Sequence, residues 1–289
     1  MTIAAGFRCN DGIIICSDTL ETVGDYGKRK QSKIVVKPSV CPTPPIPMPR
    51  RKSDPPLPPP PVRPECIAVF AGAGEADFLD KLTDSIWLHI NQSGLSFDAR
   101  VGALEDAAIE FHQKYWPVYP PDQRPEVHLV VALWTSDKYG LFKVIGPIVN
   151  EVITYESVGY GISLSKYICD RFYRKSMSMR DARIISVYML EEVKEHVQWC
   201  GGDSHVLSLS ASGYTDYLTD FDVEWGKNRF ARFDKSLGPL LVAIGDSSTS
   251  SEEFVQHLRV FVARMRKMRS ELVELEAAID SYCEMARGK

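Results

Sequence analysis

The first 34 residues place the strongest constraint on how this chain folds. Residues 2–8 have the composition of a strand, residues 10–12 (Asn-Asp-Gly) form a turn signal, and a second extended run ends at Asp18. Two such runs joined by a short turn of this type are typical of a β-hairpin. Because Ile13, Ile14 and Ile15 are consecutive, the second strand is expected to be buried on both faces.

Thr2 stands directly behind the initiator methionine in this hairpin. Removal of Met1 would expose a hydroxyl and a free α-amine on one residue, which could serve as a nucleophile and its base. Asp18 and Lys33, if held near Thr2, would tune both groups. Each residue alone is also explained as a strand residue, a strand end or a solvated charge, but together their order and spacing favour a site.

The overall composition narrows the class of protein. The chain has 289 residues, of which 44% are hydrophobic and 25% charged, as in ordinary globular proteins. The net charge of −4 argues against a nucleic-acid-binding protein. No apolar run reaches the roughly 18 residues of a membrane span, and no signal-peptide layout is present, so a cytoplasmic location is expected.

The chain carries no signature of a cofactor or metal site. Its seven cysteines are scattered without Cys-x-x-Cys pairs, which indicates reduced thiols rather than a disulfide or zinc framework. A Gly-rich phosphate loop and a Gly-x-Ser-x-Gly motif are also missing from the sequence. We therefore expect no cofactor, no metal and no nucleic-acid partner.

The pattern of apolar residues predicts the remaining elements. Further strands are predicted at residues 33–37, 65–72, 127–134, 139–145, 149–155, 205–210 and 240–244. Helices are predicted from about residue 74, over 96–115 and 163–173, after an N-cap at Ser178 with Asp181 three residues on, and after Ser250. This order predicts an α+β fold, a four-layer αββα sandwich of two antiparallel sheets flanked by helices, plus a long C-terminal helix.

Two segments stand apart from this pattern. Residues 38–64 contain 13 of the 19 prolines, which excludes a helix or an interior strand and predicts an extended insertion. Apolar residues then follow a heptad spacing between Phe254 and Tyr282, which indicates a helix that pairs with another helix or packs on its own domain. The predicted organisation is therefore one domain over residues 1–245, with the insertion at 38–64, and a C-terminal heptad-patterned helix over 250–287.

Several motifs together resemble a known family. Residues 2–7 (Thr-Ile-Ala-Ala-Gly-Phe), 11–18, 32–34 and 70–77 resemble the opening motifs of proteasome β-type subunits. Residues 177–182 and the Gly201-Gly202 pair are similar to the region of that family's second helix pair. The resemblance covers roughly residues 2–215 without the insertion, and the chain looks like a divergent, bacterial-type member.

The resemblance implies a threonine-type N-terminal nucleophile hydrolase. It implies that Thr2 attacks an amide carbonyl with its own α-amine as base, and that Asp18 and Lys33 tune the nucleophile. It also implies that the backbone N–H of Gly72 stabilises the oxyanion. The expected substrate is a peptide or protein, the expected assembly is a homo-oligomeric ring or stacked ring, and an ATP-dependent unfoldase is left open as a partner.

The chain departs from that family where the N-terminal amine is supported. Where the family has a supporting serine, this chain has Tyr160. Where the family has an aspartate and a second serine, this chain has Val197 and Cys200. Their loss would slow or abolish catalysis, although His196 and Asp203 lie close enough in sequence to substitute. The alternative function is therefore a catalytically inactive ring or scaffold subunit. A third is an interaction module that recruits partners through the proline-rich segment and the heptad helix.

Overall fold

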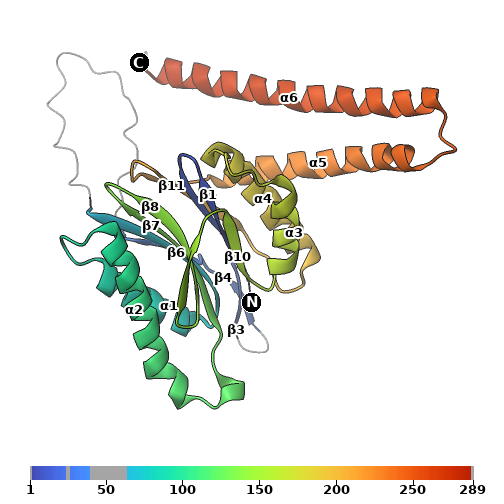
Figure 1. Cartoon of the computed structure of the whole chain (residues 1–289). Coiled ribbons are helices and arrows are strands. Elements are labelled where there is room, and N and C mark those ends of the chain that lie inside the picture. Colours follow the sequence, from blue (N-terminus) through green and yellow to red (C-terminus); the bar gives the residue numbers. More distant parts are fainter. Residues whose placement is uncertain (1, 24–26, 40–63, 288–289) are drawn as a thin grey trace. The chain divides into compact units, whose positions relative to one another are not determined.

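The computed structural model describes residues 2–23, 27–39 and 64–287 (Figure 1). The chain divides into two compact units, of which the first extends to Val223 and the second begins at Glu224. In the first unit two antiparallel sheets are stacked and each carries a pair of helices on its outer face. The predicted α+β sandwich of two antiparallel sheets with a long C-terminal helix is confirmed.

Each of the two stacked sheets has five strands. The first sheet has the order β10-β1-β2-β11-β12, and the second has the order β5-β6-β7-β8-β9. The strands of the first sheet are β1 (Ile3–Cys9), β2 (Gly12–Asp18), β10 (Tyr155–Gly159), β11 (Ser204–Ser210) and β12 (Thr215–Tyr217). Those of the second are β5 (Ile34–Lys37), β6 (Cys66–Gly74), β7 (Val127–Thr135), β8 (Tyr139–Ile145) and β9 (Ile148–Val152). A separate hairpin is formed by β3 (Leu20–Val23) and β4 (Gly27–Lys30).

The helices are α1 (Ala76–Ile90), α2 (Phe97–Tyr115), α3 (Ile162–Phe172), α4 (Met179–His196), α5 (Asp220–Gly245) and α6 (Ser251–Arg287), with short 3-10 turns at Trp116–Val118 and Pro121–Gln123. Helices α1 to α4 cover the outer faces of the sandwich, whereas most of α5 and all of α6 belong to the second unit. The predicted cap at Ser178 is confirmed, because its hydroxyl accepts a hydrogen bond from the Asp181 N–H at 3.2 Å. No helix of the described ranges is both long and apolar enough to cross a membrane.

The alternation of side chains along the strands explains the core. In β2, Ile13 and Ile15 lie in the cluster between the two sheets, whereas Ile14 points to the opposite face, which α4 covers. In β6, Val69 lies between the sheets and Phe70 lies against α1 and α2. Because both faces of these strands are covered, their sequences are continuous apolar runs rather than alternating ones.

Two predicted strands are wrong. Residues 240–244 belong to helix α5, in which Leu240 and Ala243 are buried while Leu241, Val242 and Ile244 are exposed. The spacing of three between the buried residues is helical, but the short apolar run could not be distinguished from a strand by its composition. Residues 149–155, predicted as one strand, instead contribute to β9 and β10, which lie in different sheets.

Two predicted features lie partly or wholly outside the described residues. These are the proline-rich stretch over residues 40–63 and the side chains of the heptad pattern from Leu272 onward. In the described part of the pattern, the Phe261 ring contacts the Phe233 ring of α5 with centroids 6.2 Å apart. This part of α6 therefore contacts a helix of its own chain.

Candidate active site

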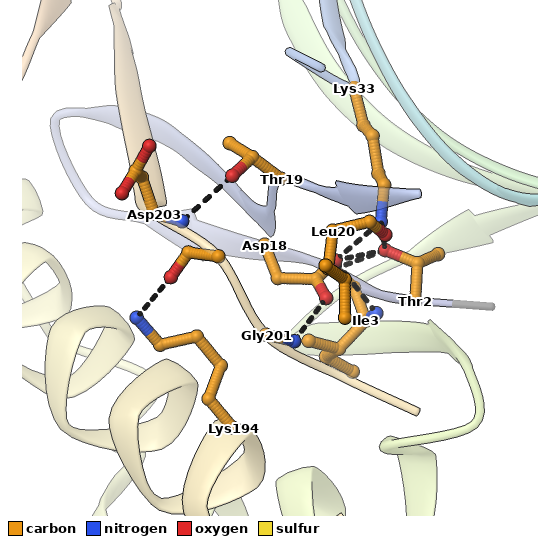
Figure 2. Close-up of polar contacts among 10 residues, drawn as sticks. Thr2, Ile3, Asp18, Thr19, Leu20, Lys33, Lys194, Gly201 and Asp203 are labelled. Carbon is orange, nitrogen blue, oxygen red and sulfur yellow. Dashed lines mark hydrogen bonds and ion pairs between the residues drawn. The ribbon is translucent and has the colours of Figure 1, made fainter. Parts of the chain in front are cut away.

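The structure brings together three of the residues expected to form a site. Thr2 precedes β1, Asp18 is the last residue of β2, and Lys33 immediately precedes β5. The pairing of Ala4 with Ser17 in the β1–β2 register places the start of β1 beside Asp18. Thr2 and Asp18 are buried, and their side chains point toward the amine of Lys33 (Figure 2).

The Asp18 carboxylate is held by donors on both of its oxygens. Its Oδ1 accepts hydrogen bonds from the Thr2 hydroxyl, from Lys33 Nζ at 2.7 Å and from the Ile3 N–H at 3.3 Å. Its Oδ2 accepts a hydrogen bond from the Gly201 N–H at 2.9 Å. A carboxylate that is completely removed from water needs this number of donors, because an unpaired buried charge is strongly destabilising.

The Lys33 amine has one acceptor for each of its three N–H groups. It donates to Thr2 Oγ1, to Asp18 Oδ1 and to the backbone carbonyl of Leu20. Burial lowers the pKa of Lys33 below its usual range, and the Asp18 carboxylate opposes this shift. The lysine is thus positioned to stabilise negative charge on the Thr2 oxygen and to exchange a proton with it more readily than a solvated lysine would.

Gly72, the fourth residue expected at the site, lies in β6 next to Lys33. It is one residue beyond Ala71, which pairs with Ile34, so the glycine lies beside Lys33 in the sheet. A Cβ atom at this position would approach Leu79 Cδ2 to 2.6 Å and the His128 carbonyl oxygen to 3.0 Å. The packing of β6 between β7 and α1 therefore favours a glycine here, independently of any catalytic role.

A pocket of about 70 Å³ opens where these residues meet. Thr2, Lys33 and Gly72 contribute to its lining. Its remaining walls combine apolar side chains with two carboxyl groups, and include Val35, Phe70, Leu79, Leu129, Glu21 and Asp80. Burial raises the pKa of the Asp80 carboxyl, and the nearby carboxylates Asp84, Asp77 and Glu21 raise it further.

The positions at which the chain departs from the proteasome pattern have other roles here. Tyr160 is exposed, and its backbone N–H donates to the Thr2 carbonyl at 2.8 Å. Cys200 is buried, and burial raises the pKa of its thiol to about 12, with a further contribution from Asp18. His196 and Asp203, the two residues proposed as substitutes, have no described contact with Thr2. Instead, His196 Nε2 lies 3.7 Å from Glu192 Oε2, and Asp203 Oδ1 lies 2.9 Å from Lys30 Nζ.

Two groups that complete the site were not predicted from the sequence. They are the Leu20 carbonyl, which accepts from Lys33, and the Gly201 N–H, which donates to Asp18. Both are backbone groups, so the residue type carries no signal for them. Among the described residues, no group of three or more His, Cys, Asp or Glu side chains is arranged to hold a metal ion.

Gly159 fixes the carbonyl end of Thr2, and its replacement is expected to disturb the site. Its φ is +101°, and a Cβ atom would lie 2.2 Å from the Thr2 carbonyl oxygen. Gly159→Ala should therefore lower the free energy of unfolding for two reasons. The clash with the Thr2 carbonyl costs about 1–3 kcal/mol, and a positive φ at an alanine costs about 1–2 kcal/mol. Urea unfolding measures the sum.

Gly94→Ala provides the matched control for this prediction. Gly94 also has a positive φ, +77°, but an added Cβ there would meet no atom within 4 Å. Gly94→Ala should therefore show only the smaller, conformational cost. Equal destabilisation by the two variants would mean that the contact with Thr2 is not significant.

Comparison with known proteins shows which fold this is. No model of a protein family matches the sequence, and no curated protein matches it. Solved structures with a proteasome-like fold do match, and Anbu proteins are among them. The Anbu (Gly-1) mutant from Hyphomicrobium sp. strain MC1 is 14% identical, with 82% of this chain and 95% of that chain covered and a TM-score of 0.62.

Two further structures agree with this result. The structure described as the helical assembly of the Anbu complex from Pseudomonas aeruginosa is 11% identical, with 87% of this chain and 99% of that chain covered and a TM-score of 0.64. Anbu (ancestral beta-subunit) from Yersinia bercovieri is 13% identical, with 81% of this chain and 97% of that chain covered and a TM-score of 0.58. At these identities the similarity establishes the fold.

The resemblance to proteasome β-type subunits requires a correction. The solved structures named above are Anbu proteins, a group related to those subunits but divergent from them. The N-terminal motifs therefore pointed to the correct fold but to the wrong family. The physical reason is that Thr2, Asp18 and Lys33 lie at strand ends that belong to the shared fold. Their spacing therefore does not distinguish between the families that have this fold.

Proposed function

We propose that the protein is a cytoplasmic, threonine-type N-terminal nucleophile hydrolase that cleaves peptide bonds within a homo-oligomeric assembly. One observation carries this proposal. The Thr2 hydroxyl, Asp18 and Lys33 are in mutual hydrogen-bond contact, and Thr2 and Lys33 line a pocket. A nucleophile in contact with a buried ion pair is the arrangement that such chemistry needs.

The reaction begins with removal of Met1, which frees the α-amine of Thr2. Thr2 Oγ1 then attacks the carbonyl carbon of a peptide bond, and its proton passes to the α-amine. An α-amino group titrates near 7.7–8.0, roughly the working pH, and so can accept and return a proton. The Lys33 ammonium stabilises negative charge on the attacking oxygen, and Asp18 keeps the lysine charged and in place.

The tetrahedral intermediate then collapses. The protonated α-amine gives its proton to the leaving nitrogen, the C–N bond breaks, and an ester forms between the substrate acyl group and Thr2. Water, deprotonated by the α-amine, hydrolyses this ester and regenerates the threonine. In this proposal the Gly72 N–H donates to the oxyanion, a contribution of about 3 kcal/mol in other hydrolases.

The proposed oligomer is supported by a comparison rather than by a described interface. One structure of the same fold, from Pseudomonas aeruginosa, is a helical assembly. A peptide or protein is the proposed substrate, and an ATP-dependent unfoldase would be needed only for folded substrates. Size-exclusion chromatography of the purified chain measures the assembly state.

Covalent labelling tests the proposed chemistry directly. The purified full-length protein is incubated with a peptide epoxyketone, and the intact mass and the labelled residue are determined. The expected result is a protein that lacks Met1 and carries one adduct on Thr2. The Thr154→Ala variant is the control, since the Thr154 side chain makes no described hydrogen bond, and its labelling should be unchanged.

The alternative, a catalytically inactive scaffold subunit, predicts the opposite outcome. Retention of Met1, or the absence of an adduct on a chain that lacks Met1, would favour it. The observation behind this alternative is the buried Cys200 thiol beside Asp18 and Lys33, where the proteasome pattern has a serine. A thiol is a weaker hydrogen-bond donor than a hydroxyl and would support the α-amine less well.

A further inference from the structure

A basic pocket lies between α5 and α6, in the second unit of the chain. It has a volume of about 300 Å³. Its lining consists of Arg232, Lys235 and Ser236 from α5 and of Arg264, Lys267 and Met268 from α6. Four of these six residues are cationic. In each helix the other two lining residues follow the first by three and four positions, which places all three on one face of that helix.

Specific contacts between the two helices hold this pocket in shape. The Arg232 guanidinium donates to both carboxylate oxygens of Glu271, at 2.8 and 3.2 Å. The rings of Phe233 and Phe261 are in contact, and Arg229 donates to the carbonyl of Met268. Figure 1 shows the two helices running side by side in opposite directions. The cationic side chains therefore converge because of the pairing of the helices.

The charges around the pocket are not balanced. Arg232 is paired with Glu271, and the charge of Lys267 also acts on that carboxylate. Among the residues whose side chains the structure describes, no ion pair involves Lys235 or Arg264. Residues 259–269 of α6 contain five cationic residues and no acidic one, although the chain as a whole has a net charge of −4. Like charges brought together repel, so this arrangement favours binding of a counter-ion.

We propose that this pocket binds a polyphosphate anion, which is a chain of linked phosphate groups as in inorganic triphosphate or the triphosphate of a nucleotide. The pocket has four cations and Glu271 supplies one negative charge, so an excess of three positive charges remains, which matches an anion of several charges. A ligand with a single carboxylate would neutralise only one of them. An arginine binds phosphate through a fork of two N–H donors and a lysine through a mobile point charge. The pocket volume is at the lower end of the range for small-ligand sites.

Calorimetry with the full-length protein at physiological salt tests the proposal. Inorganic tripolyphosphate is expected to bind with one molecule per chain. Arg264→Gln combined with Lys267→Gln should weaken this binding at least tenfold. Arg266→Gln combined with Arg269→Gln is the matched control, because it removes the same charge from the same helix but outside the pocket. The control should change the affinity by less than twofold.

Two further titrations separate the sources of the ligand. Equal affinity for ATP and tripolyphosphate would indicate recognition of the phosphates alone, and tighter binding of ATP would indicate a nucleotide ligand. Orthophosphate should bind more weakly than either. Lys235→Gln, on the other helix, should also weaken binding and serves if the α6 double variant does not fold.

Three results would overturn the proposal. They are the absence of tripolyphosphate binding, equal weakening by the pocket and control variants, and binding of orthophosphate as tight as that of tripolyphosphate. The second of these would mean that the helix attracts anions only through its overall charge.

Discussion

Thr2→Ala is expected to reduce peptide hydrolysis by the full-length protein to background, a loss of at least roughly 10³-fold. The substitution removes the oxygen that attacks the carbonyl while the α-amine, Lys33 and Asp18 remain. The fold should persist, because the side chain that is lost is small and Asp18 keeps the hydrogen bonds from Lys33, the Ile3 N–H and the Gly201 N–H. The measurement is the turnover of a panel of fluorogenic peptides.

The control for this prediction keeps the hydroxyl. Thr2→Ser retains Oγ and should stay within about tenfold of the original turnover, since only a methyl group is lost. Intact mass must confirm that Met1 is removed from each variant. Undiminished hydrolysis by Thr2→Ala would exclude Thr2 as the nucleophile, and the peptidase proposal would then need a different residue.

Lys33→Met is expected to cause the second large effect, a loss of stability of about 3–5 kcal/mol together with loss of hydrolysis. Asp18 is completely buried and the Lys33 side chain is 14% exposed, so the substitution leaves a buried carboxylate without its cation. Urea unfolding of the purified protein measures the change. Lys30→Met is the matched control, because Lys30 and Asp203 form an ion pair whose side chains are 64% and 54% exposed.

A double variant tests whether the loss of stability comes from the unpaired Asp18 charge or from the loss of the Lys33 side chain itself. In Asp18→Asn with Lys33→Met, the amide oxygen can accept from the Gly201 N–H and the amide NH₂ group can donate to Thr2 Oγ1. The double variant should therefore be more stable than Lys33→Met alone, although it is inactive. If Lys33→Met were no more destabilising than Lys30→Met, which should cost about 0–1 kcal/mol, the buried pair would not be important to the fold.

Local patterns were sufficient to predict most of the sandwich. The Asn-Asp-Gly turn, the consecutive isoleucines of β2 and the cap at Ser178 each act over a few residues, so their effects can be read from neighbouring positions. The meeting of Asp18 and Lys33 with Thr2 could be expected only because their order resembled that of a known fold. Their individual residue types did not require it.

Other features depended on contacts between distant segments. The assignment of residues 240–244 to a helix follows from the burial of Leu240 and Ala243 on one face. The split of residues 149–155 between two sheets follows from which strands they pair with, β8 for Val152 and β1 for Tyr155. Neither choice is visible in a run of apolar and β-branched residues.

The sequence by itself therefore determined the types of the main elements and the identity of the side chains at the site. The tertiary structure alone decided that the Leu20 carbonyl and the Gly201 N–H complete the Thr2–Asp18–Lys33 cluster. It also decided that cations of α5 and α6 share one pocket. The reason is that periodicity reports which face of an element is apolar, whereas hydrogen bonds and charge clusters depend on which elements meet.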